Sequence, residues 1–226
     1  MTLRMEYEAC DGGIRLTSVS TMDRTIDLPC TVDGRPVVAV GSRFLNGSKG
    51  THGRVLRIPA SVVAMESDAL EGTTGISKIE YEGDVATFSG FGVSSTSDCR
   101  LECGDGFSFD FKGGSPMGFP EFDRFMLVSA FGLTLETAVA RLNDPVLLTD
   151  ENRDGYRRFV SQRIMPRADH AVVSGDTGEL AGLISTGMID DEGLRTLLGR
   201  SARSGKVAVT SMLMSVIRSR SQTDEP

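Results

Sequence analysis

Residues 26–32 read IDLPCTV and residues 56–62 read LRIPASV, so one order of apolar and small side chains around a proline occurs twice. The likeness continues downstream, where residues 40–45, VGSRFL, align with residues 65–70, MESDAL. An apolar–x–apolar pair marks each unit, and further pairs occur at 14/16, 79/81 and 101/103. Units repeating every 22 to 23 residues predict a solenoid, because a three-residue strand buries its inner side chains only by stacking on its neighbours.

Residues 28–41, LPCTVDGRPVVAVG, resemble the BspA-type leucine-rich repeat, whose units read approximately I-x-I-P-x-x-V-x-x-I-G-x-x-A-F. Residues 58–65, IPASVVAM, are a second copy, and the resemblance covers about residues 12–103. The usual Ala-Phe pair is replaced by Phe44-Leu45 in one unit and by Ala69-Leu70 in the next. The resemblance implies a stack of short strands that binds other molecules, and it implies no catalytic residues.

Phenylalanine alternates with other residues at Phe107, Phe109 and Phe111. Strict alternation predicts a strand with one apolar face. We expect this strand to cap the open end of the solenoid core, and the alternative is an aromatic platform for a ligand.

After about residue 119 the apolar residues follow a helical period instead. We expect short helices at about 121–130, 135–142, 149–163, 168–174, 178–185, 191–204 and 206–218. Residues 178–189 and 194–205 resemble an ankyrin-type helical pair and its successor, over about residues 166–218, although the Thr-Pro-Leu-His turn of ankyrin units is missing. The expected class is therefore α+β: a leucine-rich-repeat-type β solenoid at 1–112, then an all-α region of ankyrin-like helical pairs at 119–220. We expect the segment 112–120, KGGSPMGFP, to be an accessible linker.

The chain has 226 residues with 24 Lys and Arg against 31 Asp and Glu, a net charge of −7. A phosphate backbone is repelled by such a chain, so we expect no nucleic-acid partner. The N-terminal residues show no apolar signal segment, and no apolar run is long enough for a membrane span. We therefore expect a cytoplasmic protein with no membrane partner, whose four cysteines are reduced. The preference for Arg over Lys is typical of a GC-rich bacterial genome.

No motif for catalysis, cofactor binding or metal binding stands out. His52 and His170 are the only histidines, and neither has a partner at metal-ligand spacing. Residues 199–206, GRSARSGK, fail as a phosphate loop, because five residues separate the glycines and Val207 replaces the hydroxyl residue that binds Mg²⁺. We therefore expect no cofactor and no metal.

The expected function is non-catalytic binding of another macromolecule, a protein, as a scaffold or adaptor. The middle residue of each apolar–x–apolar pair points away from the core, and together these residues are expected to form one line: Arg15, Asp27, Arg57, Glu80 and Glu102. The line is read either as a partner-binding face or as a solvated, charge-paired surface. Two alternatives stay open: an enzyme built on carboxylates such as Asp105 and Asp110, and a subunit that only forms homo-oligomers.

Overall fold

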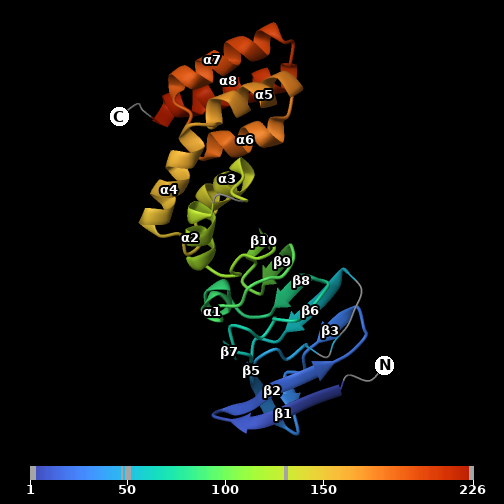
Figure 1. Ribbon diagram of the computed structural model, residues 1–226. Coiled ribbons are helices and arrows are strands. Elements are labelled where there is room, and N and C mark those ends of the chain that lie inside the picture. The colour runs from blue at the N-terminus through green and yellow to red at the C-terminus, as the bar shows by residue number, and fades with distance from the viewer. Residues whose placement is uncertain (1–3, 47, 49–51, 130–131, 224–226) are drawn as a thin grey trace. The chain divides into compact units, whose positions relative to one another are not determined.

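The computed structural model describes residues 4–46, 48, 52–129 and 132–223 (Figure 1). The chain divides into two compact units, Met1–Gly132 and Leu133–Pro226. The described strands all lie in the first unit, and helices build the second. The fold is therefore α+β, a β solenoid followed by a helical region, as the repeats and the change of period predict.

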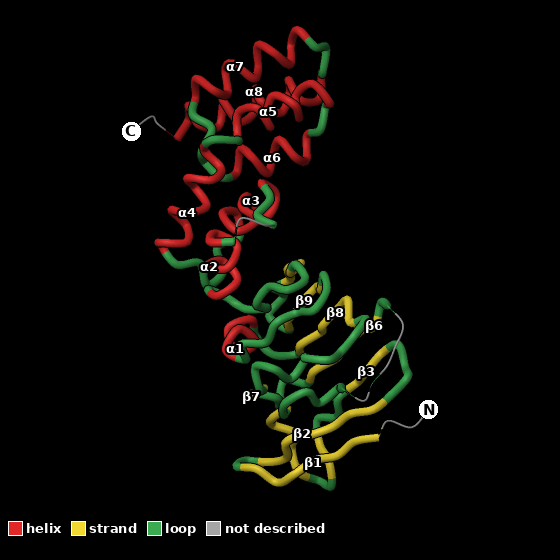
Figure 2. The backbone as a smooth tube through the Cα atoms, viewed as in Figure 1, coloured by secondary structure: helices red, strands yellow, loops and turns green. Residues whose placement is uncertain are grey.

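Two sheets make up the solenoid (Figure 2). Sheet 1 contains β1 (Arg4–Cys10), β2 (Gly13–Ser20), β5 (Arg35–Val40) and β7 (Ala64–Met65), with β4 (Thr31–Val32) paired to β5. Sheet 2 has the order β10 (Ser108–Phe111), β9 (Cys99–Cys103), β8 (Ile76–Tyr81), β6 (Arg54–Ile58) and β3 (Thr25–Asp27). After β3, β6 and β8 the chain crosses to the opposite side of the core and then returns to the next strand of sheet 2. Between β8 and β9 this opposite side is formed by α1 (Val85–Gly90).

The register of sheet 2 is the one that the repeat predicts. Ile26 pairs with Leu56 in parallel strands, Leu56 with Ile79, and Ile79 with Leu101. All four side chains are buried. A second inner row follows in which Ile58 pairs with Tyr81 and Tyr81 with Cys103, also out of solvent. Short parallel strands thus gain a continuous core by stacking in register.

The expectation that Ile14 and Leu16 begin the same stack is wrong. Their strand, β2, pairs in parallel with β5 in sheet 1 and antiparallel with β1. The reason is length: the pair at 14/16 precedes the pair at 26/28 by 12 residues, about half of the 22–23-residue coil. Half a coil carries the chain from one sheet to the other, so β2 lies on the opposite side of the core from β3.

The C-terminal end of the solenoid is closed by aromatic side chains. β10 pairs antiparallel with β9 and ends the stack of sheet 2. Phe109 and Phe111 lie with ring centroids 5.1 Å from that of Phe122, which comes from α2 (Glu121–Val128). Phe119 contacts the same rings, and Phe107 stacks on Phe109. The expected cap is confirmed: the rings of Phe107, Phe111, Phe119 and Phe122 are buried, and that of Phe109 is partly buried, which leaves little aromatic surface for a ligand.

The expected linker at 112–120 is exposed only at residues 112–114, and residues 115–120 are packed into the unit, contrary to expectation. Ser115, Met117 and Phe119 are buried, and the Met117 amide donates to Val93 O at 2.8 Å. The glycines and proline that suggested a linker instead let the backbone fold closely over the end of the core. Gly118, for example, has Ser89 Cα only 2.8 Å from where a Cβ would stand.

Six helices follow in the second unit: α3 (Leu135–Asn143), α4 (Asp150–Ser161), α5 (Ile164–Ser174), α6 (Thr177–Ser185), α7 (Asp191–Arg203) and α8 (Val207–Thr223). Short polar side chains accept backbone N–H groups at the starts of four of them: Thr134, Thr149, Asp176 and Asp190. Consecutive helices pack as pairs, α3 with α4, α5 with α6 and α7 with α8. Their core contains Leu180, Leu183, Leu194, Leu197 and Leu213.

α5 begins four residues earlier than expected. The expected helices at 149–163 and 168–174 leave Pro166 between them, but it lies in the first turn of α5, after Ile164 and Met165. The first-turn amides of a helix have no partner within that helix, so proline removes no hydrogen bond there. This early start also brings Arg167 into the helix.

Candidate functional site

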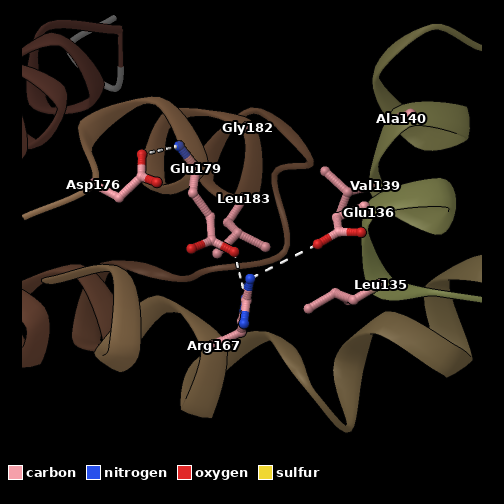
Figure 3. A pocket seen from close by; sticks show the side chains of 9 residues that line it. All are labelled: Leu135, Glu136, Val139, Ala140, Arg167, Asp176, Glu179, Gly182 and Leu183. Carbon is pink, nitrogen blue, oxygen red and sulfur yellow. Dashed lines mark hydrogen bonds and ion pairs between the residues drawn. The ribbon is translucent and has the colours of Figure 1, made fainter. Parts of the chain in front are cut away.

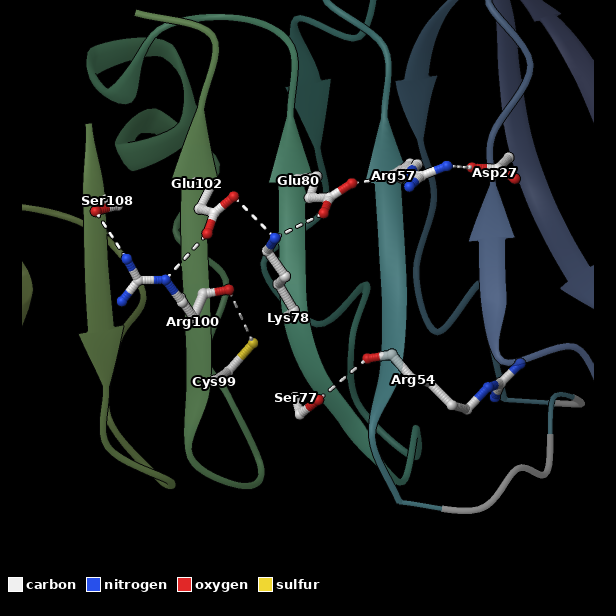
Figure 4. Close-up of polar contacts among 10 residues, drawn as sticks. All are labelled: Asp27, Arg54, Arg57, Ser77, Lys78, Glu80, Cys99, Arg100, Glu102 and Ser108. Carbon is white, nitrogen blue, oxygen red and sulfur yellow. Dashed lines mark hydrogen bonds and ion pairs between the residues drawn. The ribbon is translucent and has the colours of Figure 1, made fainter. Parts of the chain in front are cut away.

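The outward-facing side chains of sheet 2 form two rows across its strands. Asp27, Arg57, Glu80 and Glu102 pair in register from β3 to β9, and Ser108 continues the row on β10. Lys78, Arg100 and Asp110 form the neighbouring row. We call the seven charged residues of these rows the charge ladder: Asp27, Arg57, Glu80, Lys78, Glu102, Arg100 and Asp110. Figure 4 shows the side chains of all of them except Asp110.

Adjacent charges in the ladder are joined by ion pairs. Arg57 bridges Asp27 (Nη1–Oδ1, 3.3 Å) and Glu80 (Nε–Oε2, 2.7 Å). Lys78 Nζ lies 2.7 Å from Glu80 Oε1 and 2.8 Å from Glu102 Oε2. Arg100 then bridges Glu102 (Nε–Oε1, 3.0 Å) and Asp110 (Nη1–Oδ2, 3.0 Å). The sign of charge alternates from one end of the ladder to the other.

Lys78 is the residue that makes this order possible. Glu80 and Glu102 stand directly opposite each other on neighbouring strands, and two like charges in that position repel. The ammonium group of Lys78 lies between them and binds both carboxylates. Hydrogen bonds from Lys78 are the main cause that lowers the pKa of each glutamate, with the nearby Arg57 and Arg100 guanidinium groups acting in the same direction. The two carboxylates raise the pKa of Lys78 in return.

Replacing Lys78 with methionine is expected to weaken the acid dependence of stability. The lowered pKa values of Glu80 and Glu102 mean that the ladder favours the folded state above their unfolded-state pKa, about 4.3, and that this contribution is lost as pH falls through the folded-state values. The urea concentration at the midpoint of unfolding should therefore fall further between pH 7 and pH 3 in the wild type than in Lys78→Met. Lys112→Met is the control, because Lys112 binds a single carboxylate, Asp98, whose pKa is held low mainly by the Gly113 amide. Equal losses in wild type and Lys78→Met contradict the expectation.

Four of the five residues expected on the binding line lie in the ladder, and Arg15 does not. Arg15 is in β2, where it pairs with Ala39 of sheet 1, and its ion pair is with Glu8 at 3.5 Å. The repeat pattern did not place Lys78, Arg100 and Asp110 on this line, although Asp110 was considered as a catalytic carboxylate. The first two stand two residues before the expected Glu80 and Glu102, and period-two alternation places such residues on the same face.

The ladder is open to solvent. The side chains of Asp27 and Arg57 are 64% and 55% exposed, and that of Asp110 is 73% exposed. Those of Lys78 and Glu80, in the centre, are 29% and 30% exposed. Exposed pairs of this kind contribute little stability, about 0–1 kcal/mol each.

Asp105 and Asp110, which sequence reasoning offered as a catalytic pair, have separate partners. Asp105 accepts the amides of Val85 and Phe107, each at 3.1 Å, and so fixes the turn between β9 and β10. Asp110 belongs to the ladder. Among the described residues, no group of three or more His, Cys, Asp or Glu side chains is placed to hold a metal ion. Burial raises the pKa of both Cys99 and Cys103 to about 12, which keeps these thiols protonated and unreactive near neutral pH.

Within the part of the chain that the structure describes, no helix is both long and apolar enough to cross a membrane. Comparison with protein-family models, with curated proteins and with solved structures found no match to this chain. The class that its own structure defines is a β solenoid with an exposed, charge-patterned sheet, followed by a helical region.

Proposed function

We propose that this chain is a non-catalytic binding protein, a scaffold or adaptor, that presents the charge ladder to a protein partner. The observation that carries the proposal is the open outer face of sheet 2. Parallel sheets are normally covered on both faces, whereas this one exposes an ordered row of charged side chains. Solenoid proteins use such extended sheet surfaces for recognition.

The sign pattern favours a protein partner over a nucleic acid. The ladder carries four carboxylates and three cations, so its net charge is −1, and its signs alternate along the row. A phosphate backbone needs a positive surface. A protein surface that carries both signs can match the alternation, and such complementarity provides specificity.

The resemblance of the repeats to BspA-type units and of the helices to ankyrin-like pairs supports the same proposal, because both repeat types serve binding. The four cysteines are free, which supports a cytoplasmic site of action, where thiols stay reduced. Two of them, Cys99 and Cys103, lie inside the stack.

Exchanging the charges of Arg57 and Glu80, as Arg57→Glu with Glu80→Arg, is expected to abolish capture of the partner without lowering Tm. The exchange keeps a pair of opposite charges at the centre. It also puts a carboxylate at position 57 opposite Asp27 and a guanidinium at position 80 beside Lys78, so the alternation shown to the partner is broken. Exposed charges change stability little, so Tm should stay within about 4 °C of wild type. The measurements are thermal unfolding and affinity capture from cells that naturally contain the protein, with mass spectrometry of the bound proteins.

The matched control exchanges Arg43 and Glu71, an exposed pair 2.8 Å apart on two different loops of the same unit, outside sheet 2. Arg43 also lies 3.9 Å from Asp68, so it bridges two carboxylates as Arg57 does. This control should retain every captured protein. If the Arg57/Glu80 exchange also retains them, the ladder is not the binding face. The mass of the purified protein in solution, measured for both variants, shows whether the partner is a second copy of the chain.

A further inference from the structure

The helical unit contains a groove that the ladder does not involve. It has a volume of about 400 Å³ and lies among α3, α5 and α6 (Figure 3). Its apolar lining comes from Leu135, Val139 and Ala140 on α3 and from Gly182 and Leu183 on α6. Ligand sites usually occupy about 300–1,000 Å³ and combine an apolar lining with a few polar groups, and this groove fits that description.

One guanidinium group joins the two helices that form the walls. Arg167, on α5, is hydrogen-bonded to Glu179 of α6 and lies 3.8 Å from Glu136 of α3 (Nη2–Oε1). In Figure 3 the two glutamates reach Arg167 from opposite helices. Further along, Asn143 Nδ2 donates to Gly182 O at 2.9 Å. These polar contacts link α3 to α6, with the apolar lining between the two helices.

The charge around the groove is negative. Three carboxylates line it, those of Glu136, Asp176 and Glu179, against the single cation Arg167. Asp176 accepts the Glu179 amide at 2.9 Å and so caps α6, which leaves its negative charge at the rim. Glu136 is 80% exposed and only loosely paired with Arg167. An apolar lining with a net charge of −2 at its rim complements a ligand that has an aliphatic body and a cationic end.

We propose that this groove docks a peptide segment of a protein partner, with an aliphatic side chain on Leu135, Val139 and Leu183 and an adjacent Lys or Arg beside Glu136. The proposal does not rest on the charge ladder, which lies in the other unit. An experiment can therefore support one of the two proposed binding surfaces and contradict the other.

Gly182 gives the groove its depth and provides the sharpest test. A Cβ at this position would have Val139 Cγ1 as its nearest neighbour, at 4.0 Å, so a larger side chain would extend into open space. Gly182 also lies inside α6 with ordinary helical geometry, where replacing glycine favours the helix. Gly182→Met should therefore fill the groove without unfolding the protein. Ala181→Met is the matched control, because Ala181 is exposed on the same helix and does not line the groove.

The probe is a random heptapeptide library displayed on phage, selected against the full-length chain. We expect selected peptides to carry Lys or Arg within two residues of Leu, Ile or Val. Measured by fluorescence polarisation, the affinity of such a peptide should fall by at least about tenfold in Gly182→Met, as expected when an apolar site is filled, and stay unchanged in Ala181→Met. Glu136→Gln should weaken binding by about two- to fivefold, as loss of one rim charge does. Methyl NMR signals of Leu135, Val139 and Leu183 should shift on peptide addition in wild type.

Three results would overturn the proposal. One is a selection that enriches no peptide, or enriches acidic peptides that bind through Arg167. Another is a selected peptide that binds wild type and Gly182→Met equally. The last is full displacement of the peptide by spermidine at equal concentration, which would make the groove a site for a small cation instead of a peptide. Circular dichroism and thermal unfolding of Gly182→Met, run alongside, exclude misfolding as the cause of lost binding.

Discussion

Replacing Arg54 with leucine is expected to destabilise the solenoid by about 3–5 kcal/mol, because several buried carbonyls lose their donor at about 1–3 kcal/mol each. Arg54 is 1% exposed, although it carries a charge. Its guanidinium group donates to Asp23 O (3.2 Å), Thr21 O (3.0 Å) and Ser48 O (3.2 Å). Burial lowers the pKa of Arg54, but not enough to neutralise it at pH 7. The side chain therefore ties the chain before β3 to the loop before β6.

Arg57 provides the control for this prediction within the same strand. It is three residues further along β6, on the solvent face, and its partners are the exposed Asp27 and Glu80. In urea unfolding followed by circular dichroism, Arg57→Leu should change the free energy of unfolding by less than about 1 kcal/mol. Arg54→Lys should lie close to Arg54→Leu, since one ammonium group cannot reproduce the fork that reaches three carbonyls. Equal losses for Arg54→Leu and Arg57→Leu would show that the buried network does not support the fold.

The contrast between these two arginines shows what a repeat pattern can predict. Residues with apolar neighbours at i−1 and i+1, such as Arg57 and Glu80, are placed by strand alternation alone, and the structure puts them where the pattern does. Arg54 points inward, whereas arginine is usually exposed, so its residue type predicts a surface position. Arg54 binds three carbonyls only because the coil brings residues 21–23 and 48 against β6. A local sequence pattern does not predict which distant residues will contact Arg54.

The groove in the helical unit could not be predicted from the sequence, because it also depends on contacts between distant segments. Residues 176–179, DTGE, have the spacing of a capping box, and Asp176 does cap α6. The structure uses only half of that motif, because the Glu179 carboxylate binds Arg167 instead. Because proline often marks the end of a helix, the start of α5 before Pro166 was not predicted, and Arg167 was not placed in a helix. The groove depends on the packing of α3, α5 and α6, and helical periodicity gives each helix its apolar face but not the partner of that face.

Replacing Phe122 with alanine is expected to open the aromatic cap and to cost about 3–5 kcal/mol, the usual effect of removing a buried phenylalanine. Phe122 is fully buried, and its ring centroid lies 5.1 Å from those of Phe109 and Phe111 and 5.8 Å from that of Phe119. It is the ring that α2 contributes to the cluster. Its loss leaves a cavity at the end of the stack and removes the contact that holds α2 over β10. Because α2 stays attached through the backbone, the vacated end should bind the dye ANS before global unfolding.

Phe125→Ala is the matched control, because Phe125 lies on the same short helix, is 39% exposed and is not a member of the cluster. It should cost less than about 2 kcal/mol, because more than a third of its surface is already in water. Phe122→Leu should fall between the two variants, because it keeps apolar volume but loses the edge-to-face contacts. The measurements are the free energy of unfolding in urea and ANS fluorescence at native conditions. If terminal solenoid coils need a cap, only Phe122→Ala should show both a large loss and dye binding. A loss as small as that of Phe125→Ala would mean that the last coil, β9 and β10, is stable without the aromatic cluster.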